Sequence, residues 1–312
     1  MKSTKSFLRK EDITVNDLVT SGGYLPASTA KKFIKRLIRK SKLTKMMYVE
    51  MLSSHTQSLP NIAFDDDILQ VGVSGQALSE NERSKPSIGN ETWTTQLWKG
   101  EVRIPYEVLE DNVEGQKFKN TILNEAIKRI GPNIEKIVIR SDTTSGATPA
   151  LQLIDGIVSQ ATSNVVNASQ SRLTPDVLRN LIRALPKQYL DDKANLKLLT
   201  SINAEDDFRD IAAARVGTEG DKQFKNADRV FFKGIEIVPI PLFPEDLGAG
   251  TNETVCILTN PKNIGMGWWR KLKVRQYTDE SADSLVTVFS LRFDARYLVE
   301  DAVSMSDEIV NS

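Results

Sequence analysis

The sequence predicts an α+β protein, and three observations lead to that class. Apolar and charged residues alternate with period two at 98–104, which is typical of a strand with one wet face. An apolar residue then recurs every four positions through 117–140, the pattern of a long helix. Elsewhere strand-like and helix-like segments alternate without the regular rhythm of a doubly wound parallel sheet, so we expect an α+β arrangement.

Residues 66–104 predict an extended arm. Its return side is the alternating run at 98–104, and a shorter apolar run at 68–73 forms the outgoing side. The span 74–91 between them is made mainly of Ser, Asn, Glu, Gly and Lys, which offer a core almost nothing. A two-stranded ribbon of this kind is at best marginally stable alone in water. The arm is therefore expected to rest on a neighbouring copy of the chain.

The helix expected at 117–140 contains Gly131 and Pro132. Proline removes a backbone donor and clashes one turn back, so a bend or a restart is expected there. The apolar register continues across the interruption, which favours one bent helix. The alternative is two packed helices joined by a Gly-Pro turn.

Further elements are expected along the rest of the chain. Thr174 and Pro175 begin a helix that ends near 185, and Asn203 with Asp206 resembles a capping arrangement for a second helix, ended by Gly217. A short strand is expected at 196–200. Other paired strands are expected at 230–240, turned at Lys233-Gly234, and at 272–277 with 285–293.

Composition bounds the class of protein. The 312 residues are enough for one large domain or two ordinary ones, and the formal net charge is zero. No apolar run approaches the length of a transmembrane helix, and the N-terminus has no segment of signal-peptide type, so a cytoplasmic protein without membrane contact is expected. The single cysteine, Cys256, lies in an apolar run and is expected to be buried.

Positive charge is concentrated near the N-terminus. Residues 1–45 contain twelve Lys and Arg but three acidic residues, a surplus of nine. Most of these cations fall on a helix expected to begin at Ser28 or Thr29. Such a helix could face nucleic acid, lie on a membrane surface or be an ordinary solvated helix, and the solvated interpretation leads. The candidate DNA-facing residues are Lys31, Lys32, Lys35, Arg36, Arg39 and Lys40.

Motifs for catalysis, metals and cofactors are missing from the sequence. His55 is the only histidine, which excludes a zinc site of the HExxH type, and it is expected in a surface loop. The acidic run 65–67 lacks the spacing and the glycine of a calcium loop. Gly72-Val73-Ser74-Gly75 fails the spacing of a nucleophile elbow. We therefore expect no enzyme activity, no cofactor and no metal.

Five segments, taken in order, resemble the major capsid protein of tailed phages of the Hong Kong 97 type. The opening Gly22-Gly23-Tyr24-Leu25 is similar to the family's "GGYLVP" motif, although the valine is absent. The other four segments resemble the family's step into its long helix, the start of its axial domain, the return from that domain and its last strands. They lie at 104–111, at 141–157, at 232–239 and at 291–296.

The resemblance implies a fold with an N-terminal arm, an extended β-hairpin arm (E-loop), a long spine helix in a peripheral domain, and an axial domain. The boundaries that it implies are an N-terminal arm at 1–27, a first helix and connection at 28–61, an E-loop at 62–104, a spine helix at 105–142, an axial domain at 143–262 and C-terminal strands of the peripheral domain at 263–312.

The implied function is a head-shell protein that self-assembles as hexamers and pentamers around double-stranded DNA. Implied partners are other copies of the chain, a scaffolding protein, a portal and, in some relatives, decoration proteins. The implied location is the virion, with assembly in the host cytoplasm. An encapsulin-like compartment is the alternative within the fold, and an α+β enzyme with a mobile lid is the alternative outside it.

Candidate contacts between subunits follow from these expectations. On the arm they are Arg83, Lys85, Trp93 and Trp98, and on the peripheral domain they are Arg275 and Arg292. Some relatives join the arm to a neighbour through a lysine–asparagine isopeptide bond. Lys85 is the candidate arm lysine, but no asparagine or glutamate partner can be matched, so no crosslink is expected.

Overall fold

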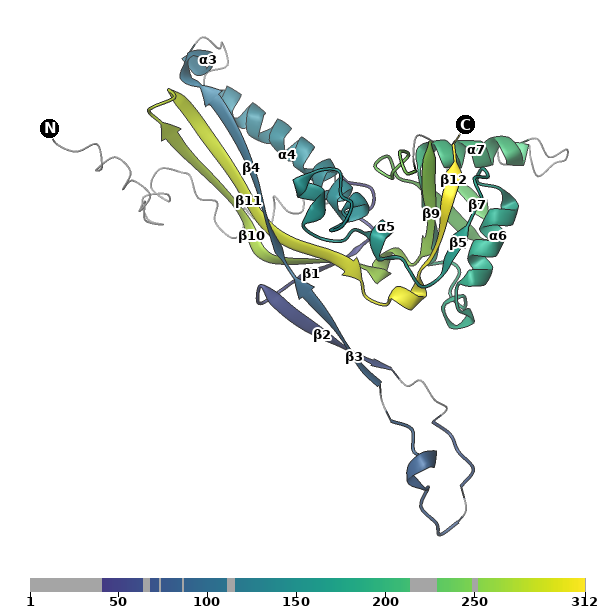
Figure 1. Cartoon of the computed structure of the whole chain (residues 1–312). Helices are drawn as coiled ribbons and strands as arrows, with labels where there is room; N and C mark the ends of the chain where they lie inside the picture. The colour runs from purple at the N-terminus through teal and green to yellow at the C-terminus, as the bar shows by residue number, and fades with distance from the viewer. Residues whose placement is uncertain are drawn as a thin grey trace.

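The computed structural model describes residues 41–63, 68–72, 74–85, 87–110, 116–213, 229–248 and 252–311, and these form an α+β molecule with two bodies and an arm (Figure 1). One body is a four-stranded sheet with a long helix. The other is a six-stranded sheet with shorter helices. The described part of the N-terminal region begins at Ser41, so the expected N-terminal arm and the basic helix with its candidate DNA-facing residues lie outside it.

The four-stranded sheet has the order β1-β10-β11-β4. Its centre is the antiparallel pair β10 (Ile264–Asp279) and β11 (Ser284–Tyr297), which confirms the expected pair of C-terminal strands. The edges are β1 (Tyr48–Met51), parallel to β10, and β4 (Gln96–Pro105), antiparallel to β11. A five-residue helix, α3 (Tyr106–Glu110), follows β4.

Helix α4 (Gln116–Arg140) runs along one face of this sheet as one continuous element, with Pro132 inside it (Figure 1). The single-helix interpretation is therefore confirmed and the two-helix alternative is wrong. Ile127, Ile134 and Val138 are buried on the expected stripe. The sheet covers them with Trp98 and Phe293, whose rings stack with centroids 5.2 Å apart. Burial of this apolar stripe is the main force that holds the helix on the sheet.

The second sheet has the order β5-β12-β9-β6-β8-β7. The strands are β5 (Val165–Asn167), β6 (Lys197–Thr200), β7 (Val230–Phe232), β8 (Ile235–Pro239), β9 (Glu253–Thr259) and β12 (Ser304–Val310). Helices α6 (Pro175–Ala184) and α7 (Ile202–Ala213) flank it, and α5 (Ile157–Gln160) lies at the junction with the first body (Figure 1). Short 3-10 turns complete the chain at Glu80–Glu82, Pro149–Gln152, Lys187–Tyr189, Pro261–Asn263 and Glu300–Ala302.

The two bodies share an apolar core. Buried residues of α4 and the long sheet belong to one cluster with Leu199 of β6 and with Val255 and Ile257 of β9. A second cluster lies between the six-stranded sheet and α6 and α7, and it contains Cys256, which is buried as expected. The C-terminal strand β12 corrects one expectation: it pairs with β9 and β5, not with the long sheet. Ile309 of β12 is fully buried in that second cluster, and burial of this side chain favours the pairing of β12 with the second sheet.

Helix starts in the second body follow local capping chemistry. The Thr174 hydroxyl accepts from the Val177 amide at 3.4 Å and caps α6, as expected. The cap expected at Asn203 is wrong, because Ser201 Oγ accepts from the Ala204 amide at 3.2 Å and begins α7 two residues earlier. Asn203 donates its side-chain amide to Glu245 instead, at 3.0 Å. Residue 217, the expected helix end, lies outside the described ranges.

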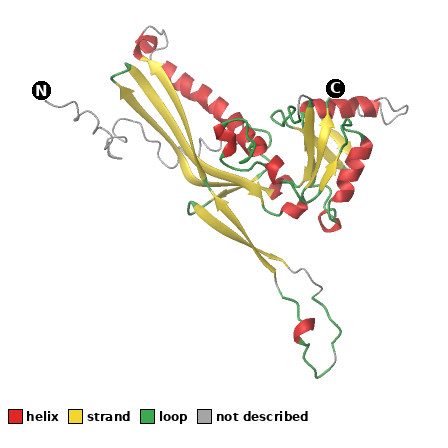
Figure 2. Cartoon of the chain, viewed as in Figure 1, coloured by secondary structure: helices red, strands yellow, loops and turns green. Residues whose placement is uncertain are grey.

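The arm is built differently from the expectation. Its strands are β2 (Thr56–Ala63) and β3 (Ser87–Thr94), paired from Thr56↔Thr94 to Ala63↔Ser87, and they project from the body (Figure 2). The described part of 68–73 is loop rather than strand. The run 98–104 belongs to β4 in the body, because its apolar face finds a core between β11 and α4.

Trp93 anchors the root of the arm. Its side chain is fully buried, and it lies over two glycines of β10, Gly265 and Gly267. A Cβ atom at Gly267 would lie 2.2 Å from Cε3 of Trp93, and one at Gly265 would lie 2.5 Å from Cη2. The missing side chains therefore create the space that the indole fills.

We expect Gly267→Ala to lower the free energy of unfolding by about 1–3 kcal/mol, because the added methyl group overpacks the indole site. Gly100→Ala is the matched control, since a Cβ there would meet its nearest atom at 4.0 Å. Urea unfolding of the unassembled subunit measures both. Equal stability of the two variants would contradict the anchoring role of Trp93.

Candidate functional site

The described residues offer little of the machinery of an enzyme. They contain no group of three or more His, Cys, Asp and Glu side chains that could hold a metal ion. Burial raises the pKa of the Cys256 thiol to about 12, which keeps this side chain protonated. His55 packs against the ring of Trp269, with centroids 5.5 Å apart. No helix among the described residues is long and apolar enough to cross a bilayer. The features that remain are surfaces.

Two of the residues expected to contact a neighbouring subunit lie inside this one. Trp93 has no exposed surface, and Trp98 is 9% exposed and stacks on Phe293. Each indole packs inside its own chain, so neither is an exposed residue of the arm, and a role in contacts between subunits stays a prediction. Sequence reasoning placed both on the arm, whereas Trp98 belongs to the body.

The other two arm residues, Arg83 and Lys85, are exposed. Arg83 Nε donates to the carbonyl of Leu78 at 3.0 Å, which ties its side chain to the loop beyond β2. The surrounding loop also exposes three apolar side chains, Ile68, Leu69 and Val71. The arm therefore presents both charge and apolar surface to solvent in the single chain.

Arg275 and Arg292 lie on the face of the long sheet that is turned away from α4. Strand pairing places Arg292 opposite Arg270, Lys273 opposite Ser290, and Ser290 opposite Lys99. Neighbours across strands share a face, so these cations lie together. We call the group the basic face, and its members are Lys99, Arg270, Lys273, Arg275 and Arg292.

The charges of the basic face are not neutralised within the described residues. None of the five forms an ion pair there, whereas Arg103 on the same face contacts Glu101 at 2.5 Å and Asp279 at 3.1 Å. Burial, and then the nearby charges of Arg270 and Arg275, lower the pKa of Lys273. Like charges placed opposite each other destabilise a sheet, so the basic face costs the single chain stability.

The ring of Trp269 supports two of these cations. The guanidinium carbons of Arg292 and Arg270 lie 4.8 and 5.7 Å from the ring centroid, within cation–π range. Nε of Arg292 is buried and has no hydrogen-bond partner. Sequence reasoning found Arg275 and Arg292 from their alternation but missed Lys99, Arg270 and Lys273, which only strand pairing brings together.

The same sheet face holds the arm root through Asp294. This side chain is 5% exposed, and it accepts hydrogen bonds from the Thr94 amide at 3.0 Å and the Ala295 amide at 2.8 Å. Arg296 lies 3.8 Å from Asp294 and 3.3 Å from Glu91 of β3. Thr94, Asp294, Arg296 and Glu91 line a polar cavity of about 400 Å³ at the junction of arm and body.

Burial raises the pKa of the Asp294 carboxyl, so the folded chain binds this proton more tightly than the unfolded chain does. The contribution of the group to stability therefore falls as pH rises from the unfolded pKa of about 3.9 through the raised folded value. We expect Asp294→Asn, which keeps an acceptor for Thr94, to raise the melting temperature at pH 7 and to lose that advantage near pH 4.

The control for this prediction is Asp301→Asn, at an exposed position. Thermal unfolding of the unassembled subunit across pH 4 to 7 measures both variants. A lower melting temperature for Asp294→Asn at pH 7 would mean that the attraction of Arg296 and the acceptor lost to the Ala295 amide outweigh the cost of burying the carboxylate.

Comparison with known proteins gives a relative in sequence and several in structure. The chain is 30% identical over 302 residues, 95% of its own length and 96% of the relative's, to YqbE of Bacillus subtilis (strain 168), which is named as a prophage capsid protein. No family model matches the chain.

Solved structures share the fold at low identity. A chain of the satellite phage P4 procapsid, which includes the size determination protein, aligns with a TM-score of 0.61 and 12% identity over 90% of this chain and 99% of that one. The capsid of a native GTA particle aligns with a TM-score of 0.61 and 14% identity over 87% and 91%.

The holo-SrpI encapsulin complex of Synechococcus elongatus PCC 7942 also aligns, with a TM-score of 0.55 and 13% identity over 86% of this chain and 87% of that one. Shell proteins of phages and of encapsulins thus share this architecture, and the fold alone does not choose between them. The choice rests on the 30% identical relative, which spans nearly the whole chain. The chain belongs to the phage capsid protein family and has the Hong Kong 97 type of fold.

Proposed function

We propose that many copies of this chain assemble, as hexamers and pentamers, into a closed icosahedral shell around double-stranded phage DNA. The role is structural rather than catalytic, and the finished shell is the head of the virion, assembled in the host cytoplasm. The observation that carries the proposal is an arm that leaves the body and exposes apolar side chains, in a chain of the capsid family.

The limited stability of the arm in a single chain supports this proposal. Among the described residues, strands β2 and β3 pair with each other in a sheet of two strands and with no other strand. Such a hairpin is marginally stable in water, and its own root contributes one buried indole and the Asp294 contacts. A neighbouring copy would cover the arm and supply the missing contacts in the manner of a repeated heterologous interface.

The basic face supports contacts between subunits at Arg275 and Arg292, and the arm supports contacts at Arg83 and Lys85. Outside residues 1–45 the chain has nine more acidic than basic residues, so other copies offer acidic surface. Electrostatic attraction between such surfaces would steer assembly. This attraction would weaken as the salt concentration rises.

The domain assignment is part of the proposal. The body of α4 and the long sheet corresponds to the peripheral domain, with 105–142 as its spine. The second body corresponds to the axial domain at 143–262, and β12 (Ser304–Val310) joins its sheet from outside that range. The arm of β2 and β3 corresponds to the E-loop. The basic N-terminal helix would make non-specific, salt-sensitive contact with packaged DNA. A scaffolding protein, a portal and decoration proteins complete the set of expected partners.

Shortening the arm tests its role. Ala63 pairs with Ser87, so an Asn-Gly turn in place of residues 64–86 would close the hairpin without changing its register. We expect this variant to fold with an unchanged melting temperature but to form no closed particles, because the contact with the neighbour is gone. Light scattering and negative-stain microscopy measure the outcome. An enzyme that lost a lid would instead keep its original oligomer, and that result would contradict the shell.

A double substitution tests the basic face. We expect Arg275→Gln with Arg292→Gln to raise the critical concentration for assembly about tenfold, a change of about 1.4 kcal/mol per subunit. Lys187→Gln with Lys193→Gln removes the same charge from exposed positions of the second body and is the control. The effect should shrink as salt rises from 50 to about 500 mM, because the Debye length shortens. Equal critical concentrations for the two pairs would contradict a contact at this face.

A further inference from the structure

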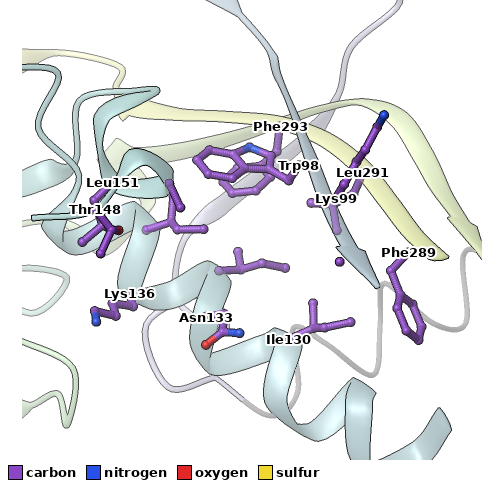
Figure 3. A pocket seen from close by; sticks show the side chains of 14 residues that line it. Trp98, Lys99, Ile130, Asn133, Lys136, Thr148, Leu151, Phe289, Leu291 and Phe293 are labelled. Atoms are coloured by element: carbon purple, nitrogen blue, oxygen red, sulfur yellow. The ribbon is translucent and has the colours of Figure 1, made fainter. Parts of the chain in front are cut away.

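An apolar cavity lies between α4 and β4. Trp98, Leu291 and Phe293 line its sheet side, and Ile130 and Ile134 line its helix side (Figure 3). Its volume is about 320 Å³. An apolar cavity of about 150 Å³ is already large enough to bind benzene, and ligand sites begin at about 300 Å³. The space is therefore large enough for a small molecule with an apolar body.

The cavity exists because β4 has a glycine on the side that faces α4. Gly100 lines the cavity and pairs with Phe289 of β11. A Cβ atom at Gly100 would meet its nearest neighbour, the Cβ of Phe289, at 4.0 Å. Protein interiors are closely packed and contain few voids larger than a water molecule. The glycine thus leaves open a space that a larger side chain would fill.

A side chain of the wall carries a buried hydrogen-bond donor. Trp98 is 9% exposed and lines the cavity, and its Nε1 has no hydrogen-bond partner among the described residues. An unpaired buried donor costs free energy, and a ligand that supplies an acceptor removes this cost. Apolar cavities stay dry, so water is a poor substitute for such a ligand. An occupant therefore gains affinity from an oxygen atom that accepts from Trp98.

The rim of the cavity is positively charged. Lys136 of α4 and Lys99 of β4 lie on opposite sides of it, and their amines point away from the apolar interior (Figure 3). Neither forms an ion pair within the described part of the chain. Lysine stems can cover apolar surface while their amines stay in water. An anionic group at the opening would therefore meet two cations that lack a partner in the single chain.

We propose that this cavity binds a medium-chain acyl compound with an anionic end. The acyl chain lies between Ile134 and Leu291, a carbonyl oxygen accepts from Nε1 of Trp98, and the anionic end lies at the rim beside Lys136. The inference concerns the single subunit and does not depend on the shell. Because the ligand contacts both α4 and the long sheet, its binding stabilises the folded chain.

N-octanoylglycine is the probe, because it combines an octanoyl chain, an amide carbonyl and a carboxylate. Octanoate lacks the amide carbonyl, and the methyl ester of N-octanoylglycine lacks the charge. We expect N-octanoylglycine to bind the unassembled full chain about tenfold more tightly than either of the others and to raise its melting temperature. Isothermal titration calorimetry, below the critical micelle concentration of each compound, measures the affinities.

Filling the cavity tests the location of the site. Gly100→Leu should fold normally, since a side chain there has open space before it, and should bind N-octanoylglycine at least about tenfold more weakly. Gly100→Ala is the matched control and should keep most of the affinity. The melting temperature of each variant without the compound checks the fold. Equal affinities for wild type and Gly100→Leu would place the compound elsewhere and overturn the proposal.

Two further variants test the polar contacts. Trp98→Phe removes the donor and should abolish the preference for N-octanoylglycine over octanoate. The ratio is taken within one variant, so a change in cavity volume affects both compounds. Lys136→Gln should reduce the preference for N-octanoylglycine over its methyl ester, whereas Lys187→Gln in the second body should not. Unchanged ratios in both Trp98→Phe and Lys136→Gln would contradict the assigned contacts.

The remaining outcomes also decide the proposal. Equal affinities of the wild-type chain for the three compounds would overturn the ligand class, because a merely apolar cavity does not distinguish them. Binding of none of them would overturn the ligand site. If none binds and Gly100→Leu also fails to form closed particles, the cavity instead receives part of a neighbouring protein. Light scattering of the wild-type chain reports on the shell separately, so failure of the ligand site leaves the proposed function standing.

Discussion

The rest of the molecule depends on the contact between α4 and the long antiparallel pair β10 and β11. A two-stranded ribbon is at best marginally stable alone in water, and a helix of this length is held mainly by burial of its apolar stripe. Each element supplies the surface that the other lacks, with the stacked rings of Trp98 and Phe293 at the centre. Glu135 of the same helix accepts the amide of Leu43 at 2.7 Å and fixes the incoming chain.

This one-sided packing divides the sheet into two chemical faces. The face on α4 is apolar and continues into the core shared with the six-stranded sheet. The opposite face carries the arm root at one end, and along the rest it carries the five cations of the basic face, which form no ion pair among the described residues. A monomer gains nothing from such a concentration of like charge, whereas a subunit in an assembly can neutralise it with a neighbour.

The arm shows the same incompleteness. Its root is secured inside the chain, where Trp93 occupies the space above two glycines and Asp294 accepts the Thr94 amide. Beyond the root, strands β2 and β3 pair with each other and with no other strand in the described part of the chain, and aliphatic side chains remain in water. A firm anchor with an unsupported extension is what a shell subunit needs, since the anchor sets the direction and the neighbour supplies the remaining contacts.

Local patterns with a period of two or four residues indicate which side of an element is apolar. Such patterns were sufficient to predict the α+β class, α4, the pair β10 and β11, the turn at Lys233-Gly234 and the burial of Cys256. The order of family-like segments also indicated the capsid fold. These local patterns could not predict which distant segments pair with each other. Residues 98–104 show the same alternation whether the strand pairs in an arm or in a body. Their partner β11 lies almost 200 positions away in the sequence, and local alternation does not indicate such a partner.

The tertiary structure alone therefore decided that Trp93 and Trp98 are core residues, that Ser201 rather than Asn203 caps α7, and that β12 returns to the second sheet. It also brought Lys99, Arg270 and Lys273 beside Arg275 and Arg292. The physical reason is the same in each case: local patterns encode which face of an element is buried, whereas long-range strand register decides which other element buries it.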